Sequence, residues 1–457
     1  MFGIGIMIRT VRYSKKHGMT ATIKKAAGIL GAPFRYFFLR EDFLRDAHRA
    51  VDRCRPRDGR YHRLHALCNV AWNLLSLVRF YKSDRKRVKI DVYKAYGLSK
   101  PDPAKMNVGI LMNGGLGDYV VAANYIWHFF RKYGNGSVPC SIDVFCEYAE
   151  KALDILFDGS FTNRAVAIKH SELYGNGIDR RYDLFIDMGR YPVVRHRNMG
   201  RINSLMPELV EYILLIERFE MKHPGLRHSP VMDAKANALC VLNCMLRIQQ
   251  PDIDGFLGVG KSFDFSLLVS DMSEEYLAEL GLKDKKFVAV VNDSDPRYGG
   301  VDNNKCWLTP YYEILLRRLK ESFPEWVFVR IGGMNDIADG CFDLDLAAKT
   351  SLDEAKIILK HAHLLISSEG GLVHLRAAVH GGCSVVLFGP TDPAFYGYEG
   401  NINLRGDGCP CACEGIITKE WSRQCLNAHK KLCMRSLTPN TVYDAIMRYE
   451  EEECAKA

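Results

Sequence analysis

The chain has 457 residues, of which 47% are hydrophobic and 25% are charged, and this composition excludes a disordered or fibrous protein. No stretch approaches the roughly 20 consecutive apolar residues that a membrane-crossing helix needs, and residues 1–9 lack the basic leader of a secretory signal. We therefore expect a cytoplasmic protein of two or three domains.

The net charge of +8 is distributed unevenly along the chain. Residues 1–105 carry 24 Lys and Arg against 8 Asp and Glu, whereas the rest of the chain is acidic overall. Aromatic and aliphatic residues interleave with this basic charge, which is typical of an amphipathic helix on an anionic membrane surface. We expect such a contact, and no nucleic-acid partner, although a helical domain with a solvated basic face explains the pattern equally well.

The N-terminal segment, residues 1–105, is predicted to be helical and to end in the turn-rich stretch 97–103. A different pattern starts at residue 106. Residues 106–255 show short apolar strands that alternate with helices: strands at 108–112, 141–146, 165–168 and 183–188, and helices at 118–133, 149–157 and within 203–250. This alternation predicts a parallel sheet with helices on both faces, as in a Rossmann-like domain.

A second alternation follows the Gly- and Asp-rich stretch 251–261, which suits a linker. Residues 256–457 are predicted to form a second Rossmann-like domain, with strands at 287–291, 326–331, 364–367 and 384–388 and helices at 310–322, 351–361 and 371–380. Pro439 suits the first turn of a last helix, because its missing N–H costs no hydrogen bond there. The acidic residues 450–453 are expected to be solvated. The predicted fold class is α/β.

The first glycine-rich turn, residues 113–118, lies between a predicted strand and a predicted helix. Gly114, Gly115 and Gly117 would let the backbone approach a ligand closely, and the helix start offers N–H groups to an anion. A tight packing turn uses glycine for the same steric reason. Asp118 is either a complement to the helix dipole or a general base.

The second glycine-rich turn, residues 368–374, has the same position between a strand and a helix. Backbone N–H groups at Gly370 and Gly371 would hold a diphosphate, and Glu369 would accept hydrogen bonds from sugar or ribose hydroxyls. A single histidine such as His374 is more often a satisfied core residue than a catalyst.

A third candidate lies in the loop after the predicted strand 287–291. Loops at the carboxyl ends of parallel strands bind ligands in such folds, and Lys305 would neutralise a phosphate there. Asn292 and Ser294 are further candidate phosphate donors in this loop, whereas a solvated lysine is the simplest alternative for Lys305 alone.

Six motifs in this order resemble glycosyltransferase family 9, the ADP-heptose-dependent heptosyltransferases of bacterial surface glycans. The resemblance covers residues 107 to about 449, and its strongest single match is the Phe-Gly-Pro-Thr-Asp-Pro run. The motifs are Asn113-Gly114-Gly115-Leu116-Gly117-Asp118, Tyr182-Asp183-Leu184-Phe185-Ile186-Asp187, Lys305-Cys306-Trp307, Leu346-Ala347-Ala348-Lys349-Thr350-Ser351-Leu352, residues 365–375 around Glu369, and Phe388-Gly389-Pro390-Thr391-Asp392-Pro393.

This resemblance implies a GT-B fold, in which two Rossmann-like domains face each other, and an inverting mechanism without a metal ion. By the same resemblance, Asp118 is the catalytic base, Lys305 binds phosphate and Thr350 lies in the stretch beside the base-binding pocket. The donor would be a nucleotide sugar, ADP-heptose, and the acceptor a glycan, a lipid-linked molecule or a protein hydroxyl.

Two departures from the family pattern leave more than one nucleotide sugar possible as the donor. Glu369 stands where the family has aspartate, and Gly370 stands where it has Ser or Thr. A transferase that uses another nucleotide sugar is therefore an alternative. A non-catalytic scaffold that binds a sugar nucleotide or a glycan is a second alternative, against which the presence of Asp118 and Lys305 speaks.

Five cysteines within residues 409–433 suggest a metal site, a disulfide or a redox role. They are Cys409, Cys411, Cys413, Cys425 and Cys433. Four thiolates suffice for a tetrahedral structural site, although the two-residue spacing is tighter than usual. Autotransporter heptosyltransferases of the family hold iron with four cysteines, so the resemblance implies structural iron or zinc, with reduced free thiols as the alternative.

Overall fold

The computed structural model describes residues 96–98, 100–134, 136, 138–147, 153, 156, 161–223, 232–292, 303–333, 337–410, 412–414, 425, 427 and 429–456. Nearly all of the predicted segment 1–105, most of the predicted helix 149–157, Ser294 and Cys411 lie outside these residues. Residues 92–223 and 233–457 group into one compact unit.

The first sheet has five strands in the order β3-β2-β1-β4-β5. Four of them are parallel and were predicted from their apolar runs: β1 (Met106–Met112), β2 (Cys140–Cys146), β3 (Arg164–Ala167) and β4 (Leu184–Met188). β5 (Pro192–Arg197) pairs with β4 in the antiparallel direction and was not predicted. The first alternation is confirmed as a parallel sheet with an antiparallel edge strand.

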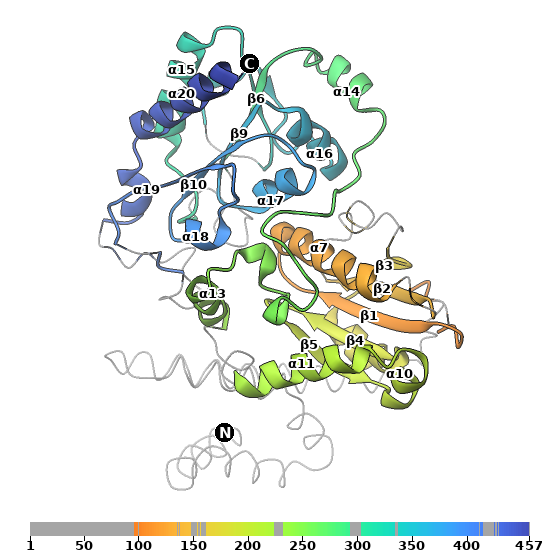
Figure 1. The fold of residues 1–457 in the computed structure, drawn as a ribbon. Helices are drawn as coiled ribbons and strands as arrows, with labels where there is room; N and C mark the ends of the chain where they lie inside the picture. Colours follow the sequence, from red (N-terminus) through yellow and green to blue (C-terminus); the bar gives the residue numbers. More distant parts are fainter. Residues whose placement is uncertain are drawn as a thin grey trace, which may run out of the picture. The chain divides into compact units, whose positions relative to one another are not determined.

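Helices pack around this sheet (Figure 1). The buried helix α7 (Leu116–Tyr133) carries the predicted helix 118–133 and begins two residues earlier than predicted. Tyr125 of α7 and Tyr212 of α11 share a hydrogen bond through their hydroxyls. The other elements are α9 (His170–Gly175), η1 (Asp179–Arg181), α10 (Met199–Leu205), α11 (Leu209–Lys222), α13 (Met232–Leu242), η2 (Arg247–Gln249) and η3 (Ile253–Gly255).

The second sheet has six strands in the order β11-β10-β9-β6-β7-β8, and all of its pairs are parallel. The predicted strands are β6 (Phe287–Val291), β7 (Val327–Arg330), β9 (Leu364–Ser368) and β10 (Ser384–Phe388). Two short edge strands were not predicted, β8 (Leu344–Asp345) and β11 (Ile402–Arg405). The second alternation is therefore confirmed too.

The helices around the second sheet include those predicted at 310–322, 351–361, 371–380 and from Pro439, together with shorter ones that were not predicted, and α15 and α20 lie side by side on one face (Figure 1). They are α14 (Ser273–Glu279), α15 (Thr309–Ser322), η6 (Asp339–Cys341), α16 (Leu352–His361), α17 (Gly371–Ala378), α18 (Pro393–Tyr396), α19 (Leu432–Ser436) and α20 (Pro439–Lys456). Pro439 is the first residue of α20, as predicted.

The expectation that residues 450–453 are all solvated is wrong. α20 continues through them, and it turns Glu450 inward, where the carboxylate accepts hydrogen bonds from Lys286 Nζ at 2.7 Å and from the ring of His363. Glu450 is buried, whereas Glu451 and Glu452 are exposed. The cause is helical periodicity, because only one face of α20 packs on the domain.

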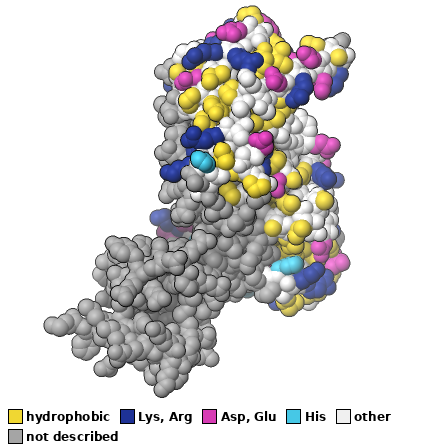
Figure 2. Space-filling view, turned by 90° about the vertical axis from the view of Figure 1, so that its left-hand side faces the viewer, with side chains coloured by type: hydrophobic (Ala, Val, Ile, Leu, Met, Phe, Trp, Pro, Cys, Tyr) yellow, Lys and Arg dark blue, Asp and Glu magenta, His cyan; other side chains and the backbone are white. Residues whose placement is uncertain are grey.

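The described surface in Figure 2 carries interspersed basic, acidic and apolar side chains. This mixed pattern agrees with the sequence, in which the excess of basic residues lies within residues 1–105. In the part of the chain that the structure describes, no helix combines the length and the apolarity that crossing a membrane requires.

Candidate active site

The turn after β1 is fixed by its neighbour β4. The backbone N–H of Asn113 donates to the Met188 carbonyl at 3.1 Å, and its side-chain amide donates to Asp187 Oδ1. Gly114 then adopts φ +121, a conformation that favours glycine. The Gly115 N–H donates to Asp118 Oδ2 at 3.0 Å. The turn therefore places the Asp118 carboxylate at the start of α7, where the helix dipole favours an anion.

Two arginines hold the other oxygen of Asp118. Arg190 Nη1 lies 3.2 Å and Arg247 Nη2 lies 2.8 Å from Oδ1. Burial opposes ionisation of this carboxyl, but the two guanidinium groups outweigh burial and hold the pKa of Asp118 well below its ordinary value. Asp118 is therefore an anion at every physiological pH.

Lys305 is held in place by its neighbour Trp307. The Trp307 backbone N–H donates to Ser368 Oγ at 3.2 Å, and its indole N–H donates to the Leu437 carbonyl at 2.8 Å. Lys305 forms an ion pair with Glu369. Burial opposes ionisation of Glu369, but Lys305 and His374 outweigh it and lower the pKa of its carboxyl. The Lys-x-Trp motif thus brings the predicted lysine to the end of β9.

His374 is buried in the first turns of α17, and its Nδ1 shares a hydrogen bond with the Tyr398 hydroxyl. Burial lowers the pKa of His374 to about 4, although Glu369 and Asp118 act in the opposite direction. His374 is therefore neutral at pH 7. The hydrogen bond to Tyr398 agrees with the prediction that His374 is a satisfied buried histidine. Its neighbours, however, are charged, so His374 lies in a polar site.

The two glycine-rich turns contact each other. A Cβ atom on Gly117 would lie 2.5 Å from His374 Cδ2, and one on Gly371 would lie 3.0 Å from Leu116 Cβ. Both positions are glycine because a side chain would push α7 and α17 apart. The contact also explains why Asp118, Arg247, Lys305 and Glu369 all act on the charge state of His374.

We call the six charged or titratable residues gathered here the central cluster: Asp118, Arg190, Arg247, Lys305, Glu369 and His374. Four of them were predicted from the sequence, and the two arginines were not. Asp118, Arg190 and Lys305 keep 26%, 18% and 21% of their side-chain surface exposed, so a solute can reach them.

A buried polar network next to the central cluster was also not predicted. Glu414 accepts hydrogen bonds from the Tyr396 hydroxyl at 2.6 Å and from Asn237 Nδ2 at 3.0 Å. Gln250 Nε2 donates to Asn237 Oδ1 at 3.2 Å. Burial raises the pKa of Glu414, against the influence of Arg190 and Lys305. This network connects α13 to the segment that follows Cys413.

The Phe-Gly-Pro-Thr-Asp-Pro run has a structural role. Phe388 ends β10, and Asp392 caps α18 by accepting a hydrogen bond from the Ala394 N–H at 2.9 Å. The short helix that Asp392 starts then presents Tyr396 to Glu414. The run thereby fixes the connection between β10 and the buried network.

The remaining predicted donor-site residues lie at the carboxyl edge of the second sheet. Asn292 follows β6 and is buried, and its side-chain amide donates to the Trp307 carbonyl at 3.3 Å, so it supports the Lys305 loop. Thr350 precedes Ser351, the N-cap of α16. Gly370 and Gly371 start α17. The phosphate-binding roles of these residues stay predictions.

Comparison with known proteins identifies the family of one part of the chain. Residues 270–404 match the family model of glycosyltransferase family 9 (heptosyltransferase). These residues are a glycosyltransferase family 9 domain. This match agrees with the motifs that predicted a glycosyltransferase, and the matched range excludes the first glycine-rich turn. No curated protein matches the chain.

The solved structure of the heptosyltransferase TibC has a similar fold. TibC of enterotoxigenic E. coli, an iron-containing dodecameric heptosyltransferase solved with ADP-D-beta-D-heptose, is 14% identical, with a TM-score of 0.50, and the match covers 76% of this chain and 77% of TibC. E. coli ADP-heptose lps heptosyltransferase II is 15% identical, with a TM-score of 0.47, over 76% of this chain and 99% of its own. The glycosyltransferase fold is GT-B, as predicted.

The cysteine-rich segment of this glycosyltransferase holds thiols that lie near one another. Burial, together with Cys409, Cys413 and Cys425, raises the pKa of Cys433 to about 12, and burial with Cys425 and Cys409 raises that of Cys413 to about 11. All four are free thiols. Among the described residues, which exclude Cys411, no group of His, Cys, Asp or Glu is arranged to hold a metal ion.

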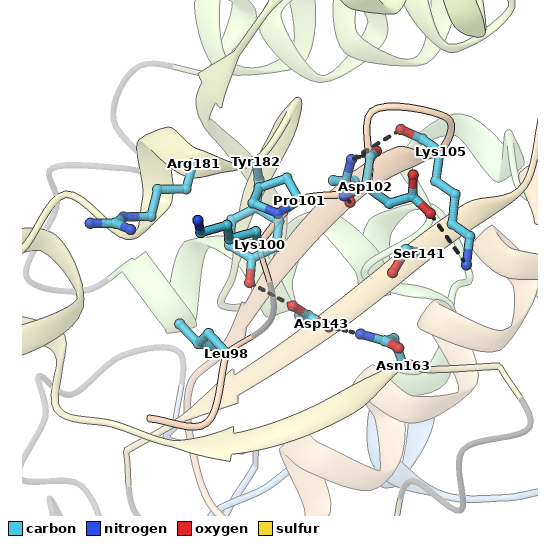
Figure 3. A pocket seen from close by; sticks show the side chains of 11 residues that line it. Leu98, Lys100, Pro101, Asp102, Lys105, Ser141, Asp143, Asn163, Arg181 and Tyr182 are labelled. Carbon is cyan, nitrogen blue, oxygen red and sulfur yellow. Dashed lines mark hydrogen bonds and ion pairs between the residues drawn. The ribbon is translucent and has the colours of Figure 1, made fainter. Parts of the chain in front are cut away.

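A pocket of about 280 Å³ lies at the opposite edge of the first sheet, where β1, β2 and β4 begin. Figure 3 shows that its polar side chains are engaged with one another: Asp143 accepts hydrogen bonds from the Tyr182 hydroxyl at 2.7 Å and from Asn163 at 2.8 Å, and Lys105 pairs with Asp102. None of the predicted site residues lines this pocket. It is separate from the central cluster.

Proposed function

We propose that this glycosyltransferase transfers heptose from ADP-heptose to a hydroxyl of a surface glycan, a lipid-linked molecule or a protein, with inversion and without a metal ion. The acceptor oxygen attacks the anomeric carbon, the bond from that carbon to the phosphate oxygen breaks, and ADP leaves with the electron pair. Asp118 takes the proton of the acceptor hydroxyl.

The observation that supports this proposal is the free capacity of the Asp118 carboxylate. Oδ1 accepts from two arginines and Oδ2 accepts from the Gly115 N–H, whereas a carboxylate has about four acceptor positions. Oδ2 can therefore accept one more hydrogen bond. An acceptor hydroxyl bound there would lie within reach of the group that removes its proton.

Residues on the other side of the central cluster suit the departing diphosphate. Lys305 supplies a positive charge, and the start of α17 at Gly370 and Gly371 offers backbone N–H groups to an anion. Preorganised donors of this kind are worth about 3 kcal/mol each in the transition state. The ion pair with Glu369 holds Lys305 in position before the substrate arrives.

The test is transfer by the full chain, with release of the corresponding nucleoside diphosphate measured for ADP-heptose and for a panel of ADP-, UDP- and GDP-sugars. We expect ADP-heptose to be the preferred donor. Preference for another nucleotide sugar would mean that Glu369 and Gly370, which depart from the family pattern, go with a different donor. Binding of a glycan with no turnover of any donor would support a non-catalytic scaffold instead.

We further propose that the enzyme is cytoplasmic and that residues 1–105 bind an anionic membrane surface, on the strength of their basic charge. The full chain should co-sediment with vesicles that contain phosphatidylglycerol and stay in solution with neutral phosphatidylcholine vesicles. Structural iron or zinc at the cysteine-rich segment stays a prediction. Elemental analysis of the purified chain decides between a metal and free thiols.

A further inference from the structure

Arg247 has one occupied and one vacant hydrogen-bonding nitrogen. It lies in η2, within the stretch that connects the two sheets, and only 4% of its side-chain surface is exposed. Nη2 donates to Asp118 Oδ1 at 2.8 Å, whereas Nη1 is buried and has no hydrogen-bond partner among the described residues. A buried donor of a charged group without a partner is costly, so its presence calls for an explanation.

The surroundings of Arg247 show what kind of partner is missing. Within the described residues, Asp118 is the one carboxylate that forms an ion pair with Arg247. His374 and Tyr398 both lie close enough to feel the guanidinium: it adds to the lowering of the His374 pKa by burial and opposes the raising of the Tyr398 pKa by burial. Arg247 therefore faces the start of α17, where the N–H groups of Gly370 and Gly371 and the side chain of Lys305 favour an anion.

We propose that Arg247 is a substrate-binding residue that bridges the Asp118 carboxylate and a phosphate oxygen of the nucleotide-sugar donor. Nη2 keeps its hydrogen bond to Asp118, and the vacant Nη1 donates to the phosphate oxygen. A guanidinium can do this because its donors lie in one plane with a fixed fork geometry, which the single ammonium of lysine lacks. The inference rests on the proposed function of the central cluster.

The bridge has a consequence for the base. In the ligand-free enzyme, Arg247 and Arg190 both stabilise the Asp118 anion, which weakens it as a base. A phosphate at Nη1 adds negative charge nearby and shares the charge of Arg247, so the pKa of Asp118 rises when the donor binds. The other facing groups do not oppose this change, because His374 is neutral and Lys305 is paired with Glu369.

The test is the affinity of the full chain for ADP, measured by calorimetry without any transfer reaction. Arg247→Gln should weaken ADP binding about 10- to 100-fold, as expected for one lost charge-assisted hydrogen bond. Arg247→Lys keeps the charge without the fork and should also lose affinity, although less. Arg317→Gln removes a guanidinium that is 68% exposed and should leave ADP affinity unchanged.

Unchanged ADP affinity in both Arg247 variants, with the folded state verified by circular dichroism, would overturn the bridge. A second readout is the acidic limb of kcat/KM, which should move to higher pH in Arg247→Lys, because Asp118 loses its hydrogen-bonded partner. Asp118→Asn separates the two proposals: it should still bind ADP, whereas its kcat of sugar transfer should fall about 100- to 10,000-fold. Normal transfer by that variant would show that Asp118 is not the base. The proposal for Arg247 would still be judged by the ADP affinities of its own variants.

Discussion

Arg247 and Asp118 are 129 positions apart in the sequence, and Arg247 Nη2 lies 2.8 Å from Asp118 Oδ1. This contact ties the stretch that connects the two sheets to the first turn of α7. The two oxygens of the carboxylate have different partners. Oδ1 accepts from two guanidinium groups, and Oδ2 accepts from the Gly115 N–H.

Asp118→Asn should lower kcat of sugar transfer about 100- to 10,000-fold, because an amide cannot take up the proton of the acceptor hydroxyl. Steady-state kinetics of ADP release measure this loss. The matched control is Asp102→Asn, which makes the same change in a carboxylate at the opposite edge of the first sheet. A variant at position 118 that keeps its kcat would show that another group is the base.

The parts of the site that the sequence predicts are those that follow directly from strand ends. Asp118, Glu369 and His374 come shortly after buried apolar strands, and Lys305 lies farther along the loop after β6. The carboxyl ends of parallel strands meet at one edge of a sheet. Their side chains therefore had to be near the ligand edge of each domain. The sequence shows that glutamate at position 369 replaces the aspartate of the family pattern, but it does not show that Glu369 forms an ion pair with Lys305.

The arginines and the buried network depend on tertiary packing and carry little local signal. Arg190 follows β4 by two residues, so the strand-end argument could have found it. Arg247 lies in a short turn between helices, where no periodicity marks a functional residue. The edge strands β5, β8 and β11 escaped prediction because they are only partly buried and lack the continuous apolar runs of the central strands. β8 and β11 are also short, and the second half of β5 is basic.

Gly117→Ala should reduce both stability and transfer, because the added methyl group would lie 2.5 Å from His374 Cδ2. Overpacking of this kind costs about 1–3 kcal/mol, and the shift of α17 displaces the diphosphate site. Urea unfolding and ADP affinity measure the two effects. Gly115→Ala is the control, since a Cβ there meets no atom within 4 Å and only the N-cap preference changes, at under about 1 kcal/mol. Equal behaviour of the two variants would contradict the contact between the turns.

His374 should make the folded state less stable as the pH falls. Its pKa is lowered from 6.5 to about 4 on folding. Between these pH values His374 is protonated in the unfolded chain and neutral in the folded chain, so a falling pH favours unfolding. Above pH 6.5 the neutral His374 does not lower the free energy of unfolding, whereas about 3 kcal/mol of that free energy is lost by pH 4. Unfolding in urea at pH 7 and pH 4.5 measures the loss.

His374→Asn should flatten this pH dependence, because asparagine keeps a polar contact for Tyr398 and does not titrate. His361→Gln, which changes an exposed histidine in the last turn of α16, should leave the dependence as it is. His363 also has a lowered pKa, so the wild-type slope includes its contribution and the comparison between variants is the informative one. Identical slopes for wild type and His374→Asn would rule out the buried neutral state of His374.

Glu450→Ala should destabilise the second domain, although its neighbours in sequence are solvated. The substitution leaves Lys286 and His363 without the carboxylate that accepts their hydrogen bonds. Removing one partner of a buried pair costs about 3–5 kcal/mol, and the 40% exposure of Lys286 reduces that figure here to about 1–3 kcal/mol. Glu452→Ala, an exposed position on the same helix, should change the free energy of unfolding by less than about 0.5 kcal/mol. Thermal and urea unfolding of both variants measure the difference, and similar midpoints would mean that Glu450 does not anchor α20.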